Sequence, residues 1–492
     1  MKFIVKLFPE ITIKSKPVRK QLTKQLRHNI RRVLKHLDVG VLVEGEWDKI
    51  EVVPQTTDPS LIRQLADALQ RIPGIANILA VEEHEFKDLD HILELATATY
   101  APQIAGKTFV VRVKRAGVHS FKSTEVERYV GGGLVQRTEA KGVDLHNPEV
   151  TVRLEIRFDK VYLIAARYEG LGGYPLGSQD TVVSLMSGGF DSGVASYLTM
   201  RRGMRTHFCF FNLGGTAHEV GVKQVACYLW ERYGLSHRVQ FITVPFEEVV
   251  AELLRSVDDS HMGVILKRLM LRAASQVAEE LGATALVTGE AVAQVSSQTL
   301  VNLSVIDAVT DTLVLRPLIT TDKQDIIRIA RQIGTEEFAK NMPEYCGVIS
   351  RKPKTRAKRD RVEYEEGKFD MAVLERALAQ KVRVNIDEVM GSVVTLNDVP
   401  TVQIPATQDV IIDIRRPDEE ERSPLHLTNN RILKIPFYEL GSQVPELAQD
   451  QRYLLFCEQG VMSQLHASHL QAAGHANVLV YRPAASGKYC AA

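Results

Sequence analysis

The chain has 492 residues, of which 45% are hydrophobic and 25% charged, and this is the composition of a globular protein. This length exceeds what one hydrophobic core organises, so we expect three or four domains. No apolar stretch approaches the roughly 20 residues of a membrane span, and the first eight residues lack the apolar run of a signal peptide. These absences predict a soluble, cytoplasmic protein with no membrane partner.

The net charge of +1 conceals an uneven distribution. Residues 1–40 hold eleven lysines and arginines against two acids, a net charge of +9, and a second basic cluster occupies residues 351–359. Two such clusters indicate contact with nucleic acid, although a charge run can also be a solvated face. The five cysteines, at 209, 227, 346, 457 and 490, lack metal-ligand spacing, which argues against a zinc site and a disulfide framework. Any cysteine chemistry is therefore expected to be catalytic or redox.

Residues 1–75 predict a small α+β sandwich of ferredoxin type. Strands are expected over 2–8 and 50–53. A long amphipathic helix follows Ser15 and Pro17, and a second helix runs from Asp58 to about Gln70, before Pro73 and Gly74 end it.

Residues 76–170 predict a second unit, with helices over 89–100 and 123–140 and strands over 108–114, 150–158 and 161–168. Glycines 131–133 fall inside the second helix, where glycine is unfavourable. We therefore expect a tight packing contact or a helix break there.

Residues 178–390 alternate between strands and helices. Strands are expected over 181–186, 206–211, 238–244 and 284–288, and helices over 190–202, 218–233, 262–281 and 323–333. Nearly continuous apolar strands separated by helices predict a parallel sheet covered on both faces. Ligands of such folds bind beyond the carboxyl ends of the strands.

The turn from Ser187 to Ser192, with sequence Ser-Gly-Gly-Phe-Asp-Ser, follows the first of these strands and opens a helix. Its glycines allow the main chain to approach an anion, and its hydroxyls add donors beside the free N–H groups of a helix start. The turn lacks the lysine of a Walker loop. It resembles instead the loop of the ATP pyrophosphatases, which cleave ATP between the α and β phosphates. A plain strand-to-helix connection is the alternative.

Residues 404–485 form the last predicted domain, in which a strand from Tyr453 ends at Cys457 and a helix follows a short loop. With Asp413-Ile414-Arg415 and Ile435-Pro436-Phe437 upstream, this segment resembles a rhodanese domain. Main-chain N–H groups of the loop and the helix start would stabilise a thiolate or persulfide at Cys457. The loop carries Glu458 and no basic residue before Ser463, which favours a protein persulfide donor over thiosulfate. An inert buried cysteine is the alternative.

Further segments extend the resemblance over most of the chain: Lys267 within a helix, Val287-Thr288-Gly289-Glu290, and residues 294–299. Together they resemble the tRNA 4-thiouridine synthetase family, which also serves thiamine biosynthesis in many bacteria. The resemblance implies a multidomain α+β and α/β fold of ferredoxin-like, THUMP, parallel-sheet ATP pyrophosphatase and rhodanese-like domains. The first two would grip tRNA by its shape; oligomerisation, as in a homodimer, is the alternative role for them.

The resemblance also implies a reaction. ATP with Mg²⁺ would adenylate uridine 8 of tRNA, and a persulfide on Cys457, loaded by a cysteine desulfurase, would replace the activated oxygen to give 4-thiouridine. Cys346 would be the resolving thiol that leaves a disulfide with Cys457, and Asp191 a catalytic carboxylate near the Mg²⁺. The sulfur-carrier protein of thiamine synthesis would be a second acceptor. The nucleotide would be bound by Leu185, Met186, Ser187, Gly188, Gly189, Ser192, Lys267, Gly289 and Gln298.

Several interpretations stay open. Lys267 is alternatively a solvated helix lysine, and Cys209 and Cys227 are interpreted as core residues. An amide-forming synthetase would also use an ATP pyrophosphatase loop but would not need Cys457. A non-catalytic RNA-binding scaffold that carries sulfur for another enzyme would need Cys457 and not Asp191.

Overall fold

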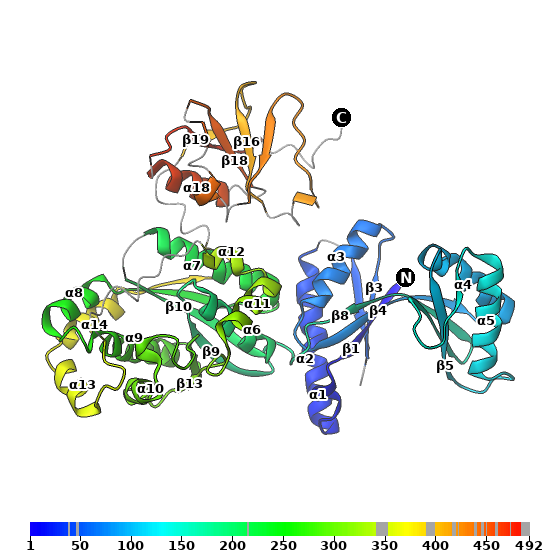
Figure 1. Cartoon of the computed structure of the whole chain (residues 1–492), viewed down its shortest axis with the longest axis horizontal. Helices are drawn as coiled ribbons and strands as arrows, with labels where there is room; N and C mark the ends of the chain where they lie inside the picture. The colour runs from blue at the N-terminus through cyan, green and yellow to red at the C-terminus, as the bar shows by residue number, and fades with distance from the viewer. Residues whose placement is uncertain are drawn as a thin grey trace. The chain divides into compact units, whose positions relative to one another are not determined.

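The computed structural model describes residues 1–37, 40–45, 49–213, 216–340, 353–389, 399–415, 420–421, 423–436, 440–443, 447–448, 450–457, 461–472 and 474–483 (Figure 1). The chain divides into two compact units: residues 1–179 with 200–204 and 235–237, and the remaining residues. Among the described residues, no helix combines the length and apolar character that crossing a bilayer requires.

The first unit begins with the predicted ferredoxin-like module. Its helix α2 (Lys16–Lys35) follows Ser15, whose side chain makes no capping bond, and has Pro17 in its first turn. The first turn of α3 (Pro59–Gln70) is capped by the Asp58 side chain, which accepts from the Ser60 N–H. Apolar residues of both helices form one core with the strands. The other elements of the module are β1 (Lys2–Leu7), α1 (Pro9–Thr12), β2 (Val41–Glu44), β3 (Lys49–Pro54) and β4 (Ile75–Glu85).

The second module shares its sheet with the first. Strand β8 (Lys160–Glu169) pairs antiparallel with β4 from Glu85↔Lys160 to Asn77↔Glu169. The result is one eight-stranded sheet of order β2-β3-β1-β4-β8-β7-β5-β6. The sequence had predicted two separate units here. The module's other elements are α4 (Leu89–Ile104), β5 (Thr108–Ala116), α5 (Ser123–Arg137), β6 (Gly142–Val143) and β7 (Val150–Arg157).

The glycine run lies inside an unbroken α5. A Cβ added at Gly133 would come within 2.2 Å of the Leu93 side chain on α4, so this glycine allows the two helices to pack closely. Of the two expectations, a tight contact is therefore confirmed and a helix break is wrong.

The second unit contains a six-stranded sheet of order β13-β12-β9-β10-β11-β14. The pairs β9–β12, β12–β13 and β10–β11 are parallel, as expected. The edge strand β14 (Val382–Asn385) runs antiparallel to β11, so the expectation of a wholly parallel sheet is wrong at this edge. An antiparallel edge strand on a parallel sheet is common. The sequence did not predict β14 because its four residues lie in a stretch that was interpreted as acidic and helical.

The helices of this domain pack around the sheet (Figure 1). Buried residues of α8, α9, α13 and α14 form one core with the strands. The elements are β9 (Gln179–Leu185), α6 (Phe190–Arg201), β10 (Met204–Asn212), α7 (Thr216–Leu229), a π-helical turn (Trp230–Gly234), β11 (Gln240–Pro245), α8 (Glu247–Ser256), α9 (Met262–Glu280), β12 (Ala285–Val287), a 3₁₀ turn (Ser296–Gln298), α10 (Leu300–Asp307), β13 (Leu313–Leu315), α11 (Lys323–Ile333), α12 (Glu336–Lys340), α13 (Arg359–Glu366) and α14 (Met371–Ala379).

The C-terminal domain has its own five-stranded sheet of order β15-β19-β18-β16-β17, and each pair is parallel. Strands β16 (Val410–Asp413) and β18 (Tyr453–Phe456) are fully buried at its centre. The remaining elements are β15 (Thr401–Val402), β17 (Arg431–Lys434), α17 (Leu440–Gln443), α18 (Val461–Ala472) and β19 (Val478–Tyr481). The expected fold class is confirmed: ferredoxin-like and THUMP-type modules, a largely parallel α/β domain and a smaller α/β domain.

Candidate active site

The glycine-serine turn connects β9 to α6. Gly188 has φ +79°, a conformation that favours glycine. The Ser192 hydroxyl closes the turn: it accepts from the Ser187 N–H and hydroxyl at 3.2 Å and donates to the Gly189 carbonyl at 3.3 Å. The turn is thus held in shape at the start of a twelve-residue helix, whose first N–H groups favour an anion.

Gly289 lies directly against the first turn of α6. A Cβ added there would be 2.5 Å from the Asp191 carbonyl carbon and 2.7 Å from the Ser192 nitrogen. The approach follows from the sheet, because β12 pairs in parallel with β9 and their carboxyl ends meet at one edge. The structure therefore brings together Gly289 and the Ser187–Ser192 turn, which are about 100 residues apart in the sequence.

Asp191 is held by two side chains whose contact with it the sequence did not predict; Gln294 was named only within the 294–299 segment, and Lys323 only as part of a helix. Its carboxylate accepts from Lys323 Nζ at 2.9 and 3.0 Å and from Gln294 Nε2 at 2.9 Å. Lys323 is the first residue of α11, and its ammonium also lies 5.5 Å from the centre of the Phe190 ring. The helix start at 323 was predicted, but helical spacing alone gave no signal that its first side chain faces the turn.

Lys267 belongs to a buried charge network and is not a fully solvated helix lysine. Its Nζ lies 2.6 Å from Glu290 Oε1, and Glu290 Oε2 accepts from Arg316 at 2.8 Å and from Thr288 at 3.0 Å. Burial opposes ionisation of Glu290, but Lys267 and Arg316 hold the pKa of this carboxyl below its usual range. The network fixes Lys267 beside the Thr288–Glu290 segment.

Gln298 carries a buried acceptor: its Oε1 has no hydrogen-bond partner among the described residues. Its main-chain carbonyl accepts from Ala293 N–H at 3.0 Å, and Ala293 has φ +66°, which strains a residue with a Cβ. An unpartnered buried acceptor and a strained neighbour are typical of a binding segment.

Leu185 and Met186 lie at the end of β9. The Met186 N–H donates to the Cys209 carbonyl at 2.8 Å, and the Met186 side chain is buried, whereas Leu185 is partly buried against the core. His218 on α7 also supports the turn, because its Nε2 lies 2.9 Å from the Ser187 carbonyl. Burial lowers the pKa of His218, so the neutral ring donates this bond.

Cys457 follows β18 in the C-terminal domain, and Ser463 belongs to the first turn of α18. The Ser463 N–H donates to Cys457 Sγ at 3.3 Å, and the Ser463 hydroxyl lies 3.4 Å from the same sulfur. The sulfur therefore receives one main-chain donor from a helix start, the arrangement that stabilises a thiolate, and the thiol itself donates to the Ser463 hydroxyl. Sequence reasoning named Ser463 only as the end of the loop.

A buried ion pair supports the segment before Cys457. The Arg415 guanidinium contacts both carboxylate oxygens of Asp413 at 2.9 and 2.7 Å and lies 4.9 Å from the Phe456 ring centre. Both side chains are only 2% exposed.

The other cysteines divide into core residues and residues outside the description. Cys209 and Cys227 are buried, which confirms their interpretation as core, and burial raises the pKa of Cys209 to about 12. Cys346 and Cys490 lie outside the described residues, as do Arg351 and Lys352 of the basic cluster. The proposed pairing of Cys346 with Cys457 therefore stays a prediction.

Comparison with known proteins places all four modules. The model for "Thiamine biosynthesis protein (ThiI)" matches residues 177–371, and those for the ThiI ferredoxin-like domain, the THUMP domain and the rhodanese-like domain match residues 2–78, 86–165 and 402–484. The chain is 55% identical over 485 residues to a tRNA sulfurtransferase of Marinobacter nauticus, with 98% of this chain and 100% of the relative covered. It is 56% identical over 484 residues to that of Photorhabdus laumondii, at the same coverage.

Two solved structures are similar to this chain. A 4-thiouridine synthetase in complex with RNA and bound ATP is 27% identical, with a TM-score of 0.70, and the match covers 78% of this chain and 99% of that chain. A Pyrococcus horikoshii protein, 19% identical with a TM-score of 0.53 over 68% of this chain and 100% of its own, shares the fold.

A THUMP module, an α/β domain with a glycine-serine turn and a rhodanese-like domain with a cysteine together define a class of sulfur-transferring enzymes that act on RNA. The chain belongs to the tRNA sulfurtransferase family, and it is an enzyme of that family.

Proposed function

We propose that this enzyme uses ATP to adenylate a uridine of tRNA, at position 8 by family resemblance, and replaces its oxygen with persulfide sulfur to give 4-thiouridine. The observation that carries the proposal is the Ser187–Ser192 turn at the start of α6, with Gly289 packed against it and Lys323 beside it. The solved relative with RNA and ATP supports both substrates.

The triphosphate would lie against the turn, where Gly188 and Gly189 would let the main chain approach an anion and Lys267 and Lys323 would supply positive charge. The buried Gln298 Oε1 fits an N–H donor such as the amino group of adenine. Leu185 and Met186, at the end of β9, would border the nucleotide with their main chain.

Mg²⁺ fits this site through Asp191. The described residues contain no group of three side chains able to hold a metal, and Mg²⁺ commonly takes one protein carboxylate with phosphate oxygens and water. Bound there, the ion would offset phosphate charge. Lys323, which donates to the Asp191 carboxylate, would hold this side chain in place.

Adenylation solves a leaving-group problem. The uracil O4 attacks the α-phosphate of ATP, pyrophosphate departs, and the oxygen becomes part of AMP, a good leaving group. Main-chain N–H groups at the start of α6 and the Lys323 ammonium stabilise the departing pyrophosphate.

The sulfur step uses Cys457 as a persulfide. The outer sulfur attacks C4 of the activated base, AMP leaves, and sulfur joins Cys457 to the base through a disulfide bond. A thiolate of Cys346 then attacks Cys457 Sγ, which releases 4-thiouridine and forms the Cys346–Cys457 disulfide; two cellular thiols reduce it. Ser463 would stabilise the Cys457 anion before loading.

Exposed basic side chains would hold the RNA backbone. Helix α2 exposes Lys20, Lys24 and Arg31 to solvent, and the downstream cluster exposes Lys354 and Arg356. Phosphate contacts of this kind grip an RNA helix by its shape. We further propose that a cysteine desulfurase of the cytoplasm loads Cys457, and that the sulfur-carrier protein of thiamine synthesis is a second acceptor.

The test is mass spectrometry of tRNA nucleosides from a deletion strain complemented with wild type, Asp191→Ala, Cys346→Ala, Cys457→Ala or, as matched control, Cys227→Ala. We expect 4-thiouridine from wild type and from the control only. Full turnover by Cys457→Ser with none by Asp191→Ala would favour an amide-forming synthetase. The reverse pattern would favour a sulfur-carrying scaffold.

A further inference from the structure

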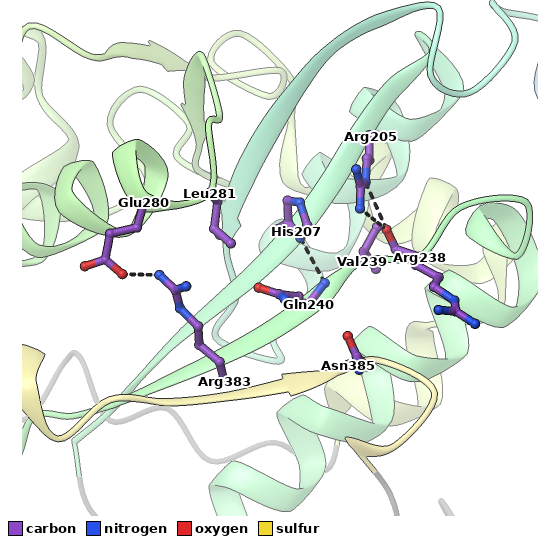
Figure 2. A pocket seen from close by; sticks show the side chains of 9 residues that line it. All are labelled: Arg205, His207, Arg238, Val239, Gln240, Glu280, Leu281, Arg383 and Asn385. Carbon is purple, nitrogen blue, oxygen red and sulfur yellow. Dashed lines mark hydrogen bonds and ion pairs between the residues drawn. The ribbon is translucent and has the colours of Figure 1, made fainter.

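A polar pocket lies at the opposite end of β10 from the glycine-serine turn. Met186, the residue before the turn, donates its N–H to the carbonyl of Cys209 in the second half of β10. The pocket, in contrast, is lined by Arg205 and His207 from the first half of β10. The cavity has a volume of about 400 Å³, and the other polar residues that line it are Arg238, Gln240, Glu280, Arg383 and Asn385 (Figure 2). None of the steps proposed above uses these residues.

The pocket carries an excess of positive charge. Three guanidinium groups line it against one carboxylate, and Glu280 is shared between Arg383 and Lys381, the latter at 3.0 Å. Arg205 donates to the main-chain carbonyl of Arg238 at 2.9 Å, a bond that fixes the side chain without neutralising it. Figure 2 shows the Glu280–Arg383 pair on one side of the pocket and Arg205 and Arg238 on the other. The wall therefore favours an anion.

The floor of the pocket holds an unmatched acceptor. The Gln240 N–H donates to His207 Nδ1 at 2.9 Å, and burial together with Arg205 and Arg383 lowers the pKa of His207 to about 4, so the ring is neutral. Gln240 Oε1 is buried and has no hydrogen-bond partner among the described residues. A ligand that fits must bring a donor as well as negative charge.

We propose that this pocket binds a phosphate ester of ribose. Phosphate oxygens accept charge-assisted hydrogen bonds from arginine, and a ribose hydroxyl is a donor that reaches an acceptor such as Gln240 Oε1. Two sources share this chemistry, the backbone of an RNA chain and a free ribose phosphate. The inference does not depend on the adenylation site.

The experiment uses the full chain and three substitutions that separate charge from structure. Arg383→Gln and Glu280→Gln break the same ion pair but change the pocket charge in opposite directions. Arg238→Gln removes a charge whose side chain is exposed and forms no hydrogen bond or ion pair with the described residues. Thermal melting confirms that each variant is folded. The probes are a labelled RNA hairpin of a tRNA acceptor stem, ribose 5-phosphate and inorganic phosphate.

For the RNA source, Arg238→Gln and Arg383→Gln weaken hairpin binding about two- to five-fold, and Glu280→Gln tightens it by a similar factor. The slope of log affinity against log salt falls by about 0.7 to 0.9 for each arginine lost. For the free source, hairpin binding is unchanged, but wild type binds ribose 5-phosphate more tightly than inorganic phosphate and the arginine variants bind it less.

Two outcomes overturn the proposal. One is unchanged binding of every probe in all three variants. The other is equal weakening by Arg383→Gln and Glu280→Gln, which would show that the ion pair only supports the fold.

Discussion

Gly289→Ala tests whether the close approach of the Thr288–Glu290 segment to α6 shapes the active site. The added Cβ would lie 2.5 Å from the Asp191 carbonyl carbon, where ordinary contact begins at 3.4 Å. The main chain must therefore separate by about 0.9 Å, and because the atoms met are backbone, no side chain can rotate away. The turn and the segment that carries Glu290 would move apart.

A displacement of about 1 Å in a group that positions substrate costs on the order of 10²-fold in rate. We therefore expect Gly289→Ala to lower AMP formation by about that factor, measured with tRNA, ATP, Mg²⁺ and a persulfide donor. Gly193→Ala is the matched control, because it lies on α6, the helix that Gly289 packs against, and its added Cβ meets only ordinary contacts at 3.7 and 3.8 Å. Wild-type AMP formation by a folded Gly289→Ala variant would refute the reasoning, as would an equal loss in the control.

Lys323→Met should lower AMP formation by about 10²-fold, because it removes positive charge beside the departing pyrophosphate, while Arg328→Met on the same helix should not; equal rates for both would contradict the role of Lys323. Because the pKa of His207 is lowered to about 4, the unfolded chain takes up its proton below 6.5 before the folded chain does, and stability falls as pH drops from 6.5 to 4, by at most about 3 kcal/mol. His207→Gln should flatten this dependence in hydrogen exchange of the β10 and β11 amides, and an unchanged profile would refute it. Arg415→Met should destabilise the C-terminal domain by about 3 kcal/mol because it leaves the buried Asp413 charge unpaired, as proteolysis of the full chain would detect. The double variant Asp413→Leu/Arg415→Met should recover part of the loss, and equal losses would count against an unpaired charge as the cause.

The sequence predicted those parts of the fold that rest on local patterns. The helix after Asp58 and Pro59, the glycine-serine turn and the strand before Cys457 all carry strong local signals, and each is present. Two short edge strands, β13 and β14, were missed, because their three or four residues are too few to establish a period.

The sequence predicted the contiguous motifs of the site but not the side chains from other elements that contact them. Ser187 to Ser192 form a contiguous motif, but the contact of Lys323 with Asp191 joins residues 132 positions apart through the order of the strands. The Glu290 network with Lys267 and Arg316 likewise depends on tertiary packing, for which a single sequence without an alignment gives no signal.

The pairing of β4 with β8 bears on how the protein can be dissected. An isolated fragment of residues 86–170 would leave the ten residues of β8 as a bare edge, with its main-chain hydrogen-bonding groups open to other chains. Such a fragment should self-associate, whereas one that begins at Met1 keeps the edge covered. The ferredoxin-like and THUMP-type modules, although matched by separate family models, therefore depend on each other for folding.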